Sequence, residues 1–231
     1  FVFPGGAIDP IVPGTLEGSR PPRDGLRRAE PCSRPRDRPR RSVKLRGLAA
    51  LAGVLLGCAS DELPVRFETA HFRYHVAPDV WLCPGLGDWL EHHYATHAEW
   101  LGAELPAGVK IDYYWLRTLN AVREKCGEPH GATPQGCVFG SNVYSWHDYH
   151  PHELVHAYGI SFPGPGPPPF FNEGLAVLLG GGGGGDVDYT LDVESLVETA
   201  VFQQLTYPAY GLIYAAAGSL TRFLVDRHGR D

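Results

Sequence analysis

The sequence contains no methionine, no long hydrophobic run and no closely spaced cysteine pair. Without Met among its 231 residues, the chain is not expected to begin at an ordinary start codon, and we expect a fragment or a sequence with incorrect ends. Its clearest apolar run has about ten residues, fewer than the roughly 20 that a membrane-spanning helix needs. The absence of a Cys-x-x-Cys pair excludes a zinc ribbon and a thioredoxin motif.

Positive charge is scarce in most of the chain. Residues 1–46 hold 11 of the 20 Lys and Arg residues, whereas residues 58–231 hold 9 basic and 21 acidic residues, a net charge of −12. Binding to phosphate needs a basic surface, so we expect no nucleic acid partner. The run of six glycines at 180–185 lacks the Lys-Ser/Thr pair of a phosphate-binding loop, which argues against nucleotide binding.

Residues 1–42 have the composition of a non-globular segment. They are rich in Pro, Gly and Arg and show no apolar periodicity that could bury one face. We expect this stretch to be disordered, or to be translated upstream sequence that is absent from the mature protein.

Residues 43–57 have the pattern of a signal peptide, with a short basic start followed by an apolar run. They end in Leu-Leu-Gly before Cys58, which resembles the bacterial lipobox. The resemblance implies that Cys58 is lipidated and becomes the first residue of an exported, membrane-anchored lipoprotein of the cell envelope, periplasmic or on the outer surface. The alternative interpretation is a buried core helix in a cytosolic protein.

The globular part, residues 58–231, is expected to have an α+β fold. Alternating apolar and polar residues predict strands, and apolar residues at helical spacing predict helices. The predicted strands are residues 65–76, 109–116 and 138–145, and the last of them is placed to be a sheet edge. The predicted helices are residues 88–101, 119–125, 152–158, 171–179, 191–205 and 214–227.

Three cysteines lie in the strand-bearing half of the globular part. Cys126 and Cys137 flank a turn-rich loop, and a disulfide between them is natural in an exported protein. Cys83 could instead be the partner of either one.

The strongest chemical signal is the pair His152 and His156. Two histidines four residues apart lie on one face of a helix and can reach one metal ion. Glu153 follows the first histidine and is placed to accept a proton from an attacking water. His93 and His97 have the same spacing but lack an acidic residue in the right place and a third ligand, so we expect a packed or solvated helix face there.

Glu173 is the predicted third ligand. A loop rich in Pro and Gly, residues 161–170, separates the histidine helix from a second apolar helix that carries Glu173 in its first turn. Two helices joined in this way can pack side by side. Two histidines and one carboxylate leave zinc an open position, as a catalytic site requires. A chance match and a structural metal site are the alternatives.

These two segments resemble the gluzincin metallopeptidases, of the peptidase MA-like group. The first reads His-Glu-Leu-Val-His at 152–156, and the second reads Phe-Asn-Glu-Gly-Leu-Ala at 171–176. The resemblance implies a zincin-like fold, with a small β-sheet and a helix in the N-terminal half and a helical C-terminal half. It also implies that His152, His156 and Glu173 bind zinc and that Glu153 is the general base.

The resemblance covers about residues 145–229. Residues 214–224 resemble a later helix of the group, which begins with Tyr and carries small residues. The Gly-x-Met-Glu-Asn segment of the aminopeptidase branch is missing, so nothing indicates a grip on a substrate amino terminus. Tyr214 is the candidate phenol for stabilising an oxyanion, Tyr207 and Tyr210 are alternatives, and simple packing at a helix start is a further alternative.

The predicted function is therefore zinc-dependent hydrolysis of peptide bonds in a peptide or protein substrate. Two alternatives stay open at this point. One is a zinc-containing surface lipoprotein that binds a partner without turnover, and the other is a zinc hydrolase that acts on a non-peptide substrate. The sequence leaves the cleavage preference and the oligomeric state undetermined.

Overall fold

The computed structural model describes residues 63–128, 134–162, 164, 166–181, 193–204 and 209–229, all within the compact unit Leu55–Asp231. The predictions for the upstream segment, the signal peptide and Cys58 lie outside these residues, as do most of the glycine run and Tyr207. None of the helices in this described part has the length and hydropathy needed to cross a bilayer.

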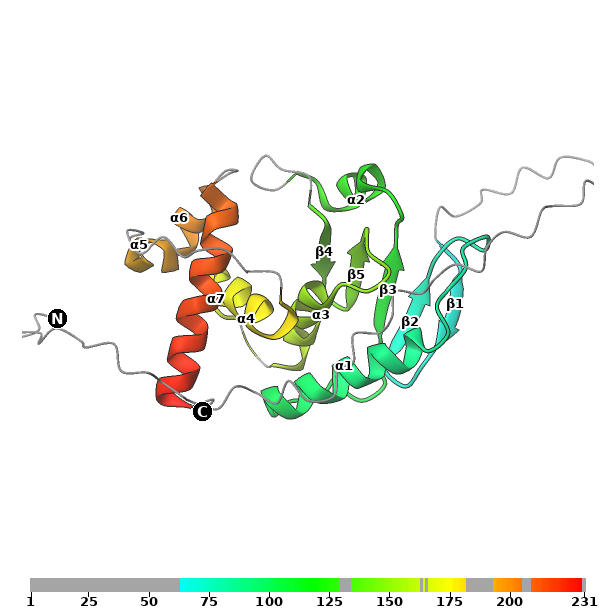
Figure 1. The fold of residues 1–231 in the computed structure, drawn as a ribbon, viewed down its shortest axis with the longest axis horizontal. Coiled ribbons are helices and arrows are strands. Elements are labelled where there is room, and N and C mark those ends of the chain that lie inside the picture. The colour runs from blue at the N-terminus through cyan, green and yellow to red at the C-terminus, as the bar shows by residue number, and fades with distance from the viewer. Residues whose placement is uncertain are drawn as a thin grey trace, which may run out of the picture. The chain divides into compact units, whose positions relative to one another are not determined.

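A five-stranded mixed sheet with helices around it confirms the predicted α+β class (Figure 1). The strand order is β1-β2-β3-β5-β4. Strands β2, β3 and β5 run parallel, and β1 and β4 pair with their neighbours in antiparallel fashion at the two edges. The strands are β1 (Val65–Glu68), β2 (Phe72–His75), β3 (Ile111–Trp115), β4 (Gly136–Phe139) and β5 (Asn142–Ser145).

Two of the predicted strands are hairpins, so those predictions were wrong in detail. Residues 65–76 form β1 and β2 with a turn between them, and residues 138–145 contain the end of β4 and the whole of β5. The second turn contains Gly140 at φ 60°, in the left-handed region that glycine adopts at little cost. Of the two strands in the second hairpin, only β4 is at an edge of the sheet, because β5 lies between β3 and β4.

The observed helices lie where the sequence predicted helices, but several of them begin or end at other residues than predicted. The predicted helix 191–205 is interrupted at Glu198. The helix that carries Glu173 begins earlier than predicted, with Pro169 in its first turn, so Glu173 lies in the second turn. The helices are α1 (Leu86–Leu101), α2 (Leu119–Cys126), α3 (Pro151–Tyr158), α4 (Pro169–Gly180), α5 (Val193–Val197), α6 (Thr199–Gln204) and α7 (Ala209–His228), and a 3₁₀ turn (Gly159–Ser161) follows α3.

Helices α1 and α3 share one hydrophobic core with the sheet. Leu90 of α1 and Leu154 of α3 are fully buried in the same cluster as Phe72 of β2 and Ile111 of β3. Helix α2 lies against β4 and β5. The predicted disulfide between Cys126 and Cys137 is confirmed and ties the end of α2 to β4, so Cys83 is the partner of neither.

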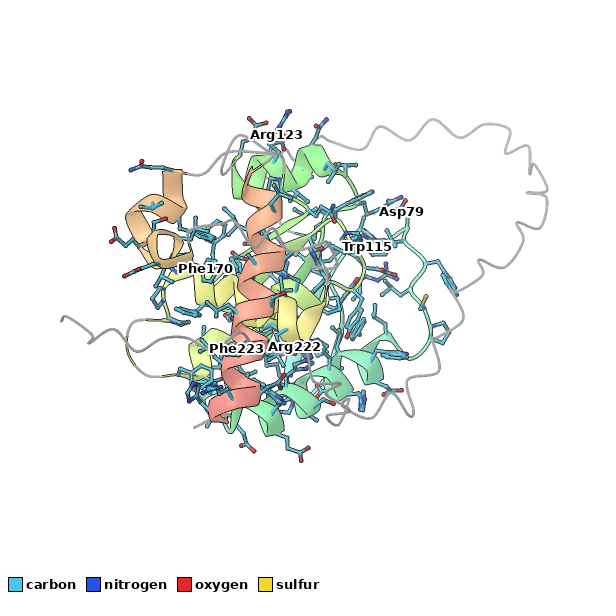
Figure 2. All side chains as sticks on the ribbon, turned by 60° about the vertical axis from the view of Figure 1, so that its left-hand side comes forward. Asp79, Trp115, Arg123, Phe170, Arg222 and Phe223 are labelled. Atoms are coloured by element: carbon cyan, nitrogen blue, oxygen red, sulfur yellow. A yellow bond between two sulfur atoms is a disulfide. The ribbon has the colours of Figure 1, made fainter. Side chains whose placement is uncertain are left out.

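Glycines allow α4 to pack closely on its two neighbours, α3 and α7 (Figure 1). A Cβ on Gly174 would clash with Thr221 and would lie 2.5 Å from the carbonyl oxygen of Ala217. A Cβ on Gly180 would lie 2.5 Å from the main-chain nitrogen of His152. Figure 2 shows Phe170 of α4 beside α7, where it belongs to a second buried cluster that also contains residues of α5 and α6.

The pair His93 and His97 is packed in the interior, which is one of the two alternatives that the sequence left open. Their rings lie 4.0 Å apart between centroids, and both side chains are buried. His93 Nδ1 lies 2.7 Å from the hydroxyl of Tyr158 in α3, and His97 Nε2 lies 3.2 Å from the carbonyl oxygen of Leu179 in α4. The pair therefore connects α1 to both α3 and α4.

The first prediction concerns the contact between α4 and α7. Replacing Gly174 with Ala should destabilise the protein by about 1–3 kcal/mol, because the added methyl group overpacks a contact made with backbone atoms. The matched control is Gly159→Ala, which adds a methyl group to open space at φ −54° and should be neutral or slightly stabilising. Thermal unfolding of both variants checks this, and equal melting temperatures would contradict the packing argument.

The second prediction concerns acid stability. Burial, helped by His97 and His92, lowers the pKa of His93 to about 3, below the value of 6.5 expected in the unfolded chain. The contribution of the neutral His93 side chain to the free energy of unfolding is therefore fully present above pH 6.5. It is lost as the pH falls toward 3, because in this range only the unfolded chain takes up the proton. We expect protonation of His93 in the unfolded chain to lower the free energy of unfolding by about 2 kcal/mol at pH 5. Denaturant unfolding at pH 7 and pH 5 should show that the free energy of unfolding falls less for His93→Asn than for the wild type.

Candidate metal centre

Three hydrogen bonds from the sheet hold the segment that leads into α3. Tyr74 and Tyr113 donate from their hydroxyls and Trp115 from its indole N–H, and the acceptors are the carbonyl oxygens of residues 146–148 at 2.7–2.9 Å. Burial raises the pKa of both tyrosines far above the usual value, so the two phenols remain donors. The position of α3 therefore depends on side chains of β2 and β3.

The structure brings the three predicted metal ligands together. His152 Nε2 lies 3.1 Å from Glu173 Oε2, His156 Nε2 lies 3.1 Å from His152 Nε2, and His156 Nε2 lies 3.3 Å from Glu173 Oε2. In the described part of the chain these three side chains are the group that could hold a metal ion. Ligands about 2.0–2.1 Å from a tetrahedral ion such as zinc lie roughly 3.3 Å apart, so the donor spacing fits such an ion.

Glu153 lies beside this donor group and against the edge of the sheet. The residue is 9% exposed. A Cβ on Gly136 of β4 would lie 2.7 Å from Glu153 Cγ, so the absence of a side chain at Gly136 makes room for the carboxylate. A glycine inside a strand often marks such a close approach. Gly136 was not identified from the sequence, and the only signal that could have identified it was this general rule about glycine in strands.

The two carboxylates of the site have pKa values shifted in opposite directions. Burial raises the pKa of Glu153, and His156 and His152 only partly offset this. Burial would also raise the pKa of Glu173, but hydrogen bonds with His152 and His156 outweigh it and lower the pKa to about 2. Burial would lower the pKa of His156, but the hydrogen bond and the charge of Glu173 raise it. Glu173 is thus held ionised, the state in which a carboxylate can bind a metal ion, and the Glu153 carboxyl takes up a proton at a higher pH than an ordinary glutamate.

A cleft of about 1300 Å³ opens onto the site. Its lining includes the three ligands, Glu153, the β4 residues Gly136 and Val138, and Tyr214 of α7. The ring of Tyr214 lies 5.6 Å from the ring of His152 between centroids. Of the three candidate tyrosines, Tyr214 is therefore placed at the site, whereas Tyr207 lies outside the described residues and Tyr210 is described only through its backbone in α7.

His150 is a cleft residue to which the sequence assigned no role. Its Nδ1 lies 3.0 Å from Ser145 Oγ, and its ring lies 6.3 Å from that of His152 between centroids. Burial, together with the nearby His147, His152 and His156, lowers its pKa to about 3. Its histidine identity two residues before His152 was the only sequence signal, because the contact with Ser145 requires the fold.

Comparison of the chain with protein-family models, with curated proteins and with solved structures gave no match.

The third prediction concerns metal binding. The wild-type protein should bind one zinc ion per chain, and replacing His152, His156 or Glu173 with Ala should weaken binding at least about a hundredfold, more than the loss of an outer hydrogen bond partner costs. The matched control is His92→Ala, which removes an exposed imidazole from α1. Metal content after dialysis checks this. Equal zinc in the wild type and in Glu173→Ala would contradict the role of Glu173 as a ligand.

Proposed function

We propose that this chain is a zinc metallopeptidase that hydrolyses peptide bonds, with a zincin-like fold of gluzincin type. The observation that carries the proposal is the meeting of three features in one cleft. They are the donor group of His152, His156 and Glu173, the buried carboxylate of Glu153 beside it, and the outer edge of β4, which among the described strands pairs only with β5. The resemblance of residues 145–229 to gluzincins supports the same conclusion.

The proposed chemistry assigns a separate task to each side chain. The two histidines and Glu173 hold the ion, and a bound zinc ion supplies Lewis acidity and makes water a nucleophile at neutral pH. Glu153 accepts the proton of the attacking water and passes it to the leaving amine, and the raised pKa of its carboxyl suits both steps. Tyr214 donates a hydrogen bond to the developing oxyanion from the α7 side of the cleft.

The edge of β4 supports a peptide as the substrate. The main-chain nitrogen of Trp146 donates to the carbonyl oxygen of Gln135, which makes Cys137 a hydrogen-bonded partner of Tyr144 in the next pair of the ladder. The N–H and C=O groups of Gly136 and Val138 therefore point away from β5. An extended peptide can pair with them as an added strand beside Glu153.

The cellular setting is a second part of the proposal. The lipobox-like sequence before Cys58 supports an exported lipoprotein that is attached to a membrane of the cell envelope. The disulfide between Cys126 and Cys137 is consistent with an oxidising compartment.

The fourth prediction tests the general base. Glu153→Gln should lower kcat about 10²–10⁴-fold while zinc content stays at the wild-type level, because the amide cannot accept the proton but leaves the ligands in place. Hydrolysis of fluorescein-labelled casein and of a quenched-fluorescent peptide library measures activity, and metal analysis measures zinc.

The matched control for this experiment is Glu99→Gln, which makes the same change on the exposed face of α1 and should leave kcat unchanged. Equal hydrolysis by the wild type and Glu153→Gln would refute the assigned mechanism. A zinc-loaded wild type that cleaves neither casein nor peptides would favour a partner-binding lipoprotein or a hydrolase for other substrates.

A further inference from the structure

His150 lies where the substrate edge and the catalytic carboxylate meet. A Cβ on Gly136 would lie 2.9 Å from His150 Nδ1 and 2.7 Å from Glu153 Cγ, so both side chains flank the same point on β4. His150 is the N-cap residue of α3, but its side chain makes no capping hydrogen bond. It lines the cleft, on the β4 side of the donor group.

A contact with Ser145 fixes the orientation of the His150 imidazole. Ser145 is fully buried, and its Oγ accepts a hydrogen bond from the main-chain N–H of His147 at 2.9 Å. Ser145 also forms a side-chain hydrogen bond with Tyr113, so its hydroxyl hydrogen has two acceptors within reach, Tyr113 and His150 Nδ1, the latter 3.0 Å away. A histidine that accepts at Nδ1 carries its own hydrogen at Nε2. Because Nδ1 is occupied by Ser145, Nε2 is the ring nitrogen left to meet a ligand.

We propose that His150 is a substrate-binding residue whose Nε2–H donates a hydrogen bond to a main-chain carbonyl oxygen of the peptide paired with β4. This inference rests on the proposed function and adds a residue to it. The strand edge at Gly136 provides only backbone groups, so a side-chain donor next to it fixes the register of the peptide relative to Glu153. Ser145 acts through His150 as a positioning residue.

The fifth prediction uses two replacements of His150, each of which retains a polar group near only one of the two ring nitrogens. Asn places its amide near the position of Nδ1 and loses the donor at Nε2, whereas Gln can place an N–H near Nε2. With fluorescein-labelled casein, His150→Asn should raise KM about tenfold, the value of one neutral hydrogen bond, and should leave kcat within about twofold. His150→Gln should restore KM to within about threefold of the wild type. Both variants should keep their zinc.

An independent measurement tests the tautomer without activity. In ¹⁵N-histidine-labelled protein, the signal that disappears in His150→Gln should come from a ring protonated at Nε2 and not at Nδ1. A ring protonated at Nδ1 would overturn the inference.

The kinetic outcomes separate the inference from the proposed function. Equal losses in the Asn and Gln variants would indicate a structural role, and a loss in kcat without a change in KM would exclude substrate binding, so either result overturns the inference. An unchanged KM in an active His150→Asn would do the same and leave the peptidase proposal standing. Absence of hydrolysis by the zinc-loaded wild type would refute the proposed function and the inference with it.

Discussion

The close contact between α3 and α4 is the constraint on which the candidate metal centre depends. Helix α3 supplies two donor atoms and α4 supplies the third, and the donor atoms lie 3.1–3.3 Å apart. Gly180 permits this at one end, where any side chain would meet the backbone of His152. Gly174, next to Glu173, permits α7 to press on the other side of α4. Helix α4 is thus fixed between two neighbours, and Glu173 has little freedom to move.

The sheet imposes the second constraint, because it positions α3 through the segment before it. Consecutive carbonyl oxygens at residues 146–148 are held by donors from β2 and β3, and those donors belong to the core that buries α1. The site is therefore the junction of a sheet-based half and a helical half. Removing either half would leave only part of the donor group in place.

Local patterns made the donor group predictable, whereas the contacts that depend on long-range packing could not be predicted from the sequence. The spacing of His152 and His156 is a property of one helix, and the Pro/Gly-rich loop before Glu173 signals a second helix, so the donor group could be predicted. The two hairpins were missed because each turn interrupts an apolar pattern for only a few residues. The contact of Gly136 with Glu153 was missed because it joins an edge strand to a helix, and no local period encodes it.

The position of β4 gives that missed contact its significance. A strand edge presents unpaired N–H and C=O groups, which are a hazard unless they are covered or used. Here the edge is tied to α2 by the Cys126–Cys137 disulfide and lies against the carboxylate of Glu153. Glycine at 136 lets the carboxylate reach the edge, and His150 flanks the same point from α3. The arrangement makes the strand edge part of the cleft, so in the proposed peptidase the same residues would set the direction of a paired peptide and the placement of the general base.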